Sequence, residues 1–188
     1  MVSAHDRAQF SCATITLHSP ERAELIRRRN NSTQPSIWDA LDQVKDPEIP
    51  VLSLWDLGVL RDLIRTPSGI TVVITPTYTG CPAIDTMTSE IKACLLKAGF
   101  QKEQIQVKNR LTPIWSTDWM STKARQALRD YGIAPPPERM ATAAAEPIHC
   151  PLCESNDTQT LSEFSSTACK ALYRCRACGE PFDYFKPY

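Results

Sequence analysis

Apolar residues recur at regular spacing in the middle of the chain, between residues 36 and 134, and this pattern predicts a small α/β domain. Ile37, Leu41 and Val44 share one face of a helix, whereas β-branched runs such as Ile70–Thr75 are typical of strands. Helices are therefore predicted over 36–46, 84–98 and 121–131, and strands over 59–65, 70–75 and 105–107. The order helix, strand, strand, helix, strand, helix indicates the α/β (α+β) class, in which a hairpin and a crossover helix lead into a third strand.

Two segments without periodic apolar residues divide the chain further. Residues 1–35 end in a polar stretch and predict a poorly ordered N-terminal extension with room for one short helix near Arg22–Arg28. Residues 135–147 are rich in Pro and Ala and predict a linker that uncouples the parts on either side of it. Residues 148–188 then form a separate cysteine-rich module, which is too small to fold without a staple such as a metal ion.

Charge and hydropathy exclude several classes of protein. The chain has 188 residues with 21 Lys+Arg and 21 Asp+Glu, so its formal net charge is zero, which argues against a non-specific nucleic-acid binder. No apolar run approaches the ~18 residues that span a bilayer, and the first residues lack the apolar stretch of a signal peptide. We therefore expect a cytoplasmic protein with neither a membrane nor a nucleic acid as partner.

The strongest chemical signal is a pair of Cys-x-x-Cys turns in the C-terminal module, Cys150–Cys153 and Cys175–Cys178. Two residues between paired cysteines let both sulfurs face one metal, and two such turns supply the four thiolates of a closed structural site. Four cysteines suit zinc or an iron–sulfur cluster, and the pattern alone does not decide between them. Cys169 lies between the two turns in sequence and is either an alternative ligand or a small buried neighbour of the site.

A second signal is Cys81, on the loop that joins the second predicted strand to the long amphipathic helix. Pro82 suits the first position of a helix, so Cys81 is predicted at the N-cap, where the helix dipole and free backbone N–H groups lower the pKa of a thiol. A thiolate is the ligand that a soft metal or a cluster iron needs, and Thr77 and Thr79 could donate hydrogen bonds to bound sulfur. The alternative is that Cys81 only fills apolar space.

Carboxylates near a predicted tight turn are further candidates. Asp56 precedes Leu57-Gly58 and is either a turn residue or an iron-binding candidate, and Asp46 is expected to end the preceding helix. Paired acids could act as acid and base, but no His, Lys or Ser stands in a suitable position beside them. A hydrolase or another nucleophilic enzyme is therefore not supported by the sequence.

Several segments resemble a known family. The stretches Asp46–Leu60 and Thr75–Pro82 are similar to the small α/β domain of iron–sulfur cluster assembly proteins, which carry a reactive cysteine at the position of Cys81. Residues 113–119, 131–136, 165–175 and 180–185 narrow the similarity to the family of D proteins of bacterial phenylacetate degradation. Members of this family are auxiliary components of the multicomponent oxygenase that epoxidises the ring of phenylacetyl-CoA. The resemblance covers residues 36–188.

The resemblance implies a non-catalytic role in making the metal centres of that oxygenase. Its implied partners are the other oxygenase subunits, especially the iron–sulfur reductase component, and a homodimer is compatible with it. Cys81 would hold iron or a cluster transiently, and zinc or a cluster would occupy the four-cysteine site. A di-iron centre of its own would need several Glu and Glu-x-x-His pairs, and only His5, His18 and His149 occur here, none in that context. The alternative is a purely structural adaptor of the same complex.

Overall fold

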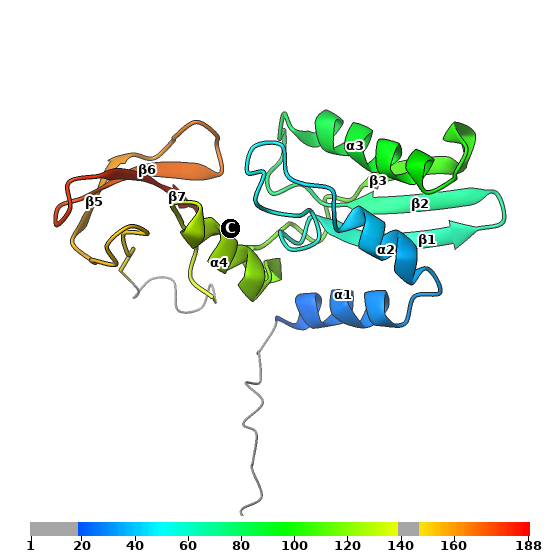
Figure 1. Cartoon of the computed structure of the whole chain (residues 1–188), viewed down its shortest axis with the longest axis horizontal. Coiled ribbons are helices and arrows are strands. Elements are labelled where there is room, and N and C mark those ends of the chain that lie inside the picture. The colour runs from blue at the N-terminus through cyan, green and yellow to red at the C-terminus, as the bar shows by residue number, and fades with distance from the viewer. Residues whose placement is uncertain (1–18, 139–146) are drawn as a thin grey trace, which may run out of the picture.

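The computed structural model describes residues 19–138 and 147–188, which form an α/β unit and a ribbon unit side by side (Figure 1). His5, Cys12, His18 and most of the predicted linker lie outside the described residues. The α/β unit contains α1 (Pro20–Asn30), α2 (Pro35–Leu41), β1 (Leu60–Thr66), β2 (Gly69–Ile74), α3 (Ile84–Lys97), β3 (Ile105–Asn109), α4 (Thr122–Asp130) and β4 (Ile133–Ala134). Two short 3₁₀ helices, Lys102–Gln104 and Thr117–Trp119, complete it, and the ribbon unit contains β5 (Thr158–Ser162), β6 (Lys170–Cys175) and β7 (Pro181–Phe185).

The first sheet has the order β1-β2-β3 and contains the three strands that the sequence predicts. β1 and β2 form an antiparallel hairpin, and β3 returns parallel to β2 after the crossover through α3. The predicted α/β (α+β) class and element order are confirmed. Helix α2 begins at Pro35 with Gln34 as its N-cap and ends at Leu41, before the end predicted at residue 46. Proline is favoured at the first position because the first helical N–H has no intrahelical partner.

The short helix predicted near Arg22–Arg28 is confirmed as α1, but it packs against the α/β unit instead of belonging to a poorly ordered extension. Ser19 caps this helix by accepting a hydrogen bond from the backbone N–H of Arg22 at 3.2 Å. The Arg22 side chain is buried and donates to the carbonyl oxygen of Trp55 at 2.7 Å, and Leu25 is also buried. Because an arginine makes the central contact, the helix lacks the apolar stripe by which sequence analysis recognises a packed helix.

The ribbon unit is a four-stranded sheet of order β4-β7-β6-β5. Its edge strand β4 comes from the end of the α/β unit and pairs in parallel with β7. The start of the predicted linker is also held, since the guanidinium of Arg125 donates to the carbonyl oxygens of Pro136 and Pro137 at 2.6 and 2.8 Å. The two units are therefore joined by backbone pairing, and the predicted uncoupling does not hold for the part of the linker that is described.

Aromatic packing completes the contact between the units. The ring of Trp115 is buried in the α/β unit and lies 6.1 Å from the ring of Phe185 and 6.2 Å from that of Tyr188, between ring centroids. The backbone N–H of Thr117 donates to the carbonyl oxygen of Tyr188 at 3.1 Å. Phe185 and Cys169 of the ribbon therefore belong to the same buried cluster as the helices and strands of the α/β unit.

No helix within residues 19–138 and 147–188 is long and apolar enough to cross a membrane.

We predict that Gly58→Ala destabilises the protein more than Gly132→Ala. Both glycines have positive φ, at 81° and 86°, so either change costs about 1–2 kcal/mol of backbone strain. Only at Gly58 would the new Cβ also lie 2.7 Å from the Cβ and 2.8 Å from the carbonyl oxygen of Trp119, which adds about 1–3 kcal/mol of overpacking. Urea unfolding of the two variants measures the difference, and equal losses would show that the Trp119 segment moves aside without cost.

Candidate metal and iron–sulfur sites

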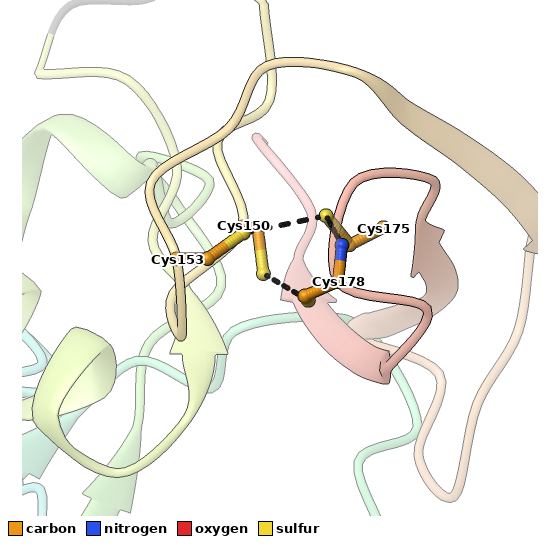
Figure 2. Close-up of side chains that lie close together, drawn as sticks. All are labelled: Cys150, Cys153, Cys175 and Cys178. Atoms are coloured by element: carbon orange, nitrogen blue, oxygen red, sulfur yellow. Dashed lines mark hydrogen bonds between the residues drawn. The ribbon is translucent and has the colours of Figure 1, made fainter.

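The four cysteines of the two predicted turns come together at one end of the ribbon unit (Figure 2). All four sulfurs lie within 4.8 Å of one another, with Sγ–Sγ distances of 3.8 Å between Cys150 and Cys178 and 3.5 Å between Cys153 and Cys175. Zinc–sulfur bonds of about 2.3 Å at tetrahedral angles place neighbouring sulfurs about 3.8 Å apart. The donor set therefore fits one zinc ion held by four thiolates.

The two cysteine turns are built alike, and this similarity aims their sulfurs at one point. In each turn the backbone N–H four residues after the first cysteine donates to its carbonyl oxygen, from Glu154 to Cys150 at 2.9 Å and from Gly179 to Cys175 at 3.0 Å. Both donors have positive φ, 62° and 83°. The backbone N–H of Cys178 also lies 3.5 Å from Sγ of Cys175 and is the main cause that lowers the pKa of that thiol, which favours the thiolate that a metal requires.

Cys169 is not a member of this four-cysteine group. Its Sγ is buried at the junction of the two units, 3.0 Å from Oγ1 of Thr167 and 4.0 Å from Oε2 of Glu48. His149 also points elsewhere, since its Nδ1 lies 3.0 Å from the carbonyl oxygen of Glu154. The structure thus brings together the four predicted ligands and places the alternative one, Cys169, against the α/β unit.

Cys81 lies between β2 and α3, as the sequence predicts, but not at the helix N-cap. Helix α3 begins at Ile84 with Ala83 as its N-cap, and Cys81 is two residues earlier, 7% exposed. Pro82 therefore does not occupy the first helical position. The backbone N–H of Ala83, next to the start of the helix, still lowers the pKa of the Cys81 thiol.

The expected lowering of the Cys81 pKa is wrong. Burial raises the pKa of the Cys81 thiol, and the negative charges of Glu48 and Asp46 raise it further. Hydrogen bonds from the Ala83 backbone and the Tyr78 hydroxyl act in the opposite direction but are outweighed. Removal from water penalises the charged form of a group, and here this penalty is larger than the stabilisation from one helix end.

The remaining candidates divide into two groups. Thr77 is buried and Thr79 is exposed, both on the Cys81 loop, so they stay candidates for contact with a bound group. Asp56 has other partners: one of its carboxylate oxygens accepts from Oγ of Ser121 at 2.8 Å, and the other pairs with Nζ of Lys123 at 3.1 Å. Both carboxylate oxygens of Asp56 are therefore bonded to residues at the start of α4, which does not favour a role as iron ligand.

Sequence analysis missed Glu48, the carboxylate that acts on Cys81. The backbone N–H groups of Glu48 and Ile49 both donate to Oδ1 of Asp46 at 2.8 Å. The Glu48 side chain on this turn lies 4.0 Å from Sγ of Cys169. Burial raises the pKa values of both Asp46 and Glu48. The segment Asp46-Pro47-Glu48 is visible in the sequence as a pair of acids near a turn, but nothing local indicates which thiols it faces.

A three-stranded α/β unit with a buried loop cysteine, joined to a four-cysteine ribbon, defines the class of iron–sulfur assembly-type proteins with a zinc ribbon. Residues 35–107 match the family described as iron-sulfur cluster assembly protein, and residues 134–186 match the PaaD zinc beta ribbon domain. The chain is 48% identical over 151 residues to an Escherichia coli K12 protein provisionally named as the D component of a 1,2-phenylacetyl-CoA epoxidase, covering 80% of this chain and 90% of that one. The chain belongs to this family of epoxidase D components.

Two other proteins are similar over the α/β unit. A Porphyromonas gingivalis protein named Fe-S protein maturation auxiliary factor is 36% identical over 95 residues, which are 49% of this chain and 87% of that one. The crystal structure of a domain of unknown function, DUF59, from Bacillus anthracis has a TM-score of 0.46 at 25% identity and covers 56% of this chain and 95% of that chain.

We predict that the full chain binds one zinc ion tightly and that Cys175→Ser loses it. Zinc binding stabilises such modules by about 10–16 kcal/mol, and removal of one of four thiolates forfeits a large part of this. Zinc content after dialysis against a chelator, followed by limited proteolysis of the ribbon unit, provides the measurement. Cys94→Ser, which changes a half-buried thiol on α3, is the matched control and should keep its zinc. Full zinc retention by Cys175→Ser would contradict the four-thiolate site.

We predict that Glu48→Gln makes Cys81 more reactive in protein freed of iron by chelation. The Glu48 charge raises the pKa of Cys81, so its removal lowers that pKa and increases the thiolate fraction at mildly alkaline pH. Iodoacetamide labelling against pH, resolved by peptide mass spectrometry, should show the Cys81 profile shifted to lower pH. The Cys94 thiol, whose pKa is raised by burial without a contribution from Glu48, should keep its profile. An unchanged Cys81 profile would mean that Glu48 does not act on it.

Proposed function

We propose that this chain is a non-catalytic auxiliary factor that helps to assemble iron–sulfur or di-iron centres in the partner subunits of a phenylacetyl-CoA epoxidase. The observation that carries the proposal is the buried Cys81, held beside Glu48 and Tyr78 on the loop of an iron–sulfur assembly-type domain. The names of the two relatives, an epoxidase component and a maturation factor, support the same role.

Cys81 is the transient iron ligand in this proposal. Its sulfur is a soft donor, which suits iron or a cluster, and Thr77 and Thr79 lie on the same loop for hydrogen bonds to bound sulfide. The raised pKa of the free thiol makes it a neutral group until a metal arrives. Iron is then cargo, which the site takes up and gives away, and the release of the thiol proton accompanies its binding.

The ribbon has a structural task in the same proposal. Cys150, Cys153, Cys175 and Cys178 hold a resident zinc ion, which stabilises the sheet β4-β7-β6-β5. The exposed Phe164 and Leu161 at the far edge of this sheet offer an apolar surface to another subunit. The iron–sulfur reductase component is the proposed client, because it needs a cluster of its own.

We predict that Cys81→Ser reduces the iron and acid-labile sulfide of the client subunits without reducing their amount. Serine is nearly isosteric but offers no soft thiolate at neutral pH, so cargo binding should be lost while the fold is kept. The oxygenase and reductase subunits are co-produced with the wild-type chain, with Cys81→Ser, with the control Cys94→Ser, or without the chain. We expect full metal content with wild type and Cys94→Ser, and a deficit in the other two.

Two outcomes would count against the proposal. Equal metal content in all four samples would exclude maturation. Full metal content with Cys81→Ser but a deficit without the chain would favour the structural adaptor, because an adaptor needs the fold and not the sulfur of Cys81. Epoxidation of phenylacetyl-CoA by the same preparations should follow the metal content.

A further inference from the structure

Two cysteines that are far apart in sequence face the same acidic groups at the junction of the two units. Sγ of Cys169, on the ribbon, lies 4.0 Å from Oε2 of Glu48, on the α/β unit. Glu48 and Asp46 also act electrostatically on Cys81. Both thiols, Cys81 and Cys169, raise the pKa of the Tyr78 phenol. Cys81 and Cys169 are 7% and 4% exposed and belong to one buried cluster. Three separate segments thus place two thiols and a carboxylate in one region.

The position of Cys169 is fixed by the docking of the ribbon on the α/β unit. The backbone N–H of Lys186 donates to the carbonyl oxygen of Cys169 at 2.9 Å, and the hydroxyl of Tyr188 donates to that of Ala168 at 3.2 Å. Tyr188 is in turn held by the backbone N–H of Thr117 at 3.1 Å. A chain of hydrogen bonds therefore runs from the α/β unit to the segment that carries Cys169.

The charges around this region favour a cation. Two carboxylates, Asp46 and Glu48, act electrostatically on both thiols. The buried cation that acts on both carboxylates, Lys170, is already paired with Asp183 at 3.0 Å. A bound metal ion would supply further positive charge and would stabilise the thiolates, which it binds directly.

We propose that Cys169 is the second thiolate ligand, and Glu48 a carboxylate ligand, for the iron that Cys81 carries, so that the ribbon completes the cargo site. The inference rests on the proposed function and adds a residue from outside the iron–sulfur assembly-type domain. On binding, both thiols release their protons to solvent and form iron–sulfur bonds, with no change in the oxidation state of the iron. Two soft sulfurs and one oxygen suit ferrous iron, alone or within a cluster.

The ligand atoms of this site are more widely spaced than those of the zinc site, which fits its role as a place of exchange. Within residues 19–138 and 147–188, the ribbon cysteines are the one group of His, Cys, Asp and Glu whose ligand atoms gather closely, within 4.8 Å. A closed set of four thiolates retains its ion. In a wider set of mixed ligands, the side chains must move closer together to bind iron and can move apart to release it. The difference in ligand number and spacing therefore separates the resident zinc from the transferred iron.

The test uses cobalt(II) as a probe of thiolate ligation in the full, zinc-loaded chain under anaerobic conditions. Zinc binds thiolate sites more tightly than cobalt, so the ribbon site stays occupied, and a chelating dye confirms that no zinc is released. Wild type should develop a sulfur-to-cobalt absorption band from two thiolates. Cys169→Ser should give roughly half of its intensity, as should Cys81→Ser, because one sulfur remains in each. The control Cys94→Ser should titrate like wild type.

Glu48→Gln provides a second reading if Cys169→Ser fails to fold. This nearly isosteric change keeps both sulfurs, so the band should keep its shape while cobalt affinity falls by about tenfold or more. Repeating the titrations with ferrous iron, with and without added sulfide, distinguishes a single ion from a cluster, since acid-labile sulfide is retained only with a cluster.

The outcomes separate this inference from the proposed function. A band that depends on Cys81 but is unchanged in folded Cys169→Ser would overturn the role of Cys169 and leave Cys81 as the carrier. No band in wild type, or a band that survives both substitutions, would overturn the cargo site as described. A third outcome is that both cysteines bind cobalt as expected but the metal content of the client subunits is equal in all samples of the co-production experiment. This outcome would support the site and overturn the maturation role.

Discussion

The packing of Trp115 against Phe185 and Tyr188 is the contact on which the arrangement of the two units depends. The indole is buried, and its Nε1–H is satisfied by the carbonyl oxygen of Leu57 at 3.2 Å, so it can turn its ring edge and face to the ribbon without leaving a polar atom unpaired. Without this anchor, the described contacts at the base of the ribbon would be mainly the pairing of β4 with β7 and the hydrogen bonds from Arg125 to Pro136 and Pro137. Fixing the end of β7 also fixes the neighbouring segment that carries Cys169, and the cargo site we propose depends on that placement.

The elements that sequence analysis predicted correctly are those specified by local patterns. The periodic apolar residues of α3 and the β-branched residues of β2 bury the faces that their spacing indicates, and the two Cys-x-x-Cys turns meet because each turn has its own internal geometry. The predicted boundaries were less accurate where two local signals compete. Pro82 is compatible with the first turn of a helix, but a proline also fits the turn that precedes a helix, and here the helix starts only at Ile84.

The errors share a physical origin, which is that long-range packing decides them. Helix α1 is held by the buried guanidinium of Arg22, and an arginine in a sequence indicates a solvent-exposed position. The pKa of Cys81 depends on burial and on Glu48, both of which depend on the folded neighbourhood rather than on the helix that follows. Cys169 and Glu48 are separated by 121 residues, so no spacing rule could have joined them. Turn chemistry therefore pointed to Asp56 rather than to Glu48, because the junction of the two units leaves no local trace in the sequence.

The separation between the zinc site and the iron cargo site that we propose follows from the chemistry of their ligands. Four thiolates in two rigid turns satisfy zinc completely, and a coordinatively closed ion neither exchanges readily nor presents an open position to a partner. Iron that is to be handed on needs the opposite: few ligands, a mixture of sulfur and oxygen, and groups that remain protonated until the metal arrives. The ribbon can serve both needs at once, since its four knuckle cysteines lie at one end of the sheet and Cys169 lies at the junction with the α/β unit. On this view the zinc ion acts on the iron only through the fold, by keeping β6 and β7 paired so that Cys169 stays opposite Glu48.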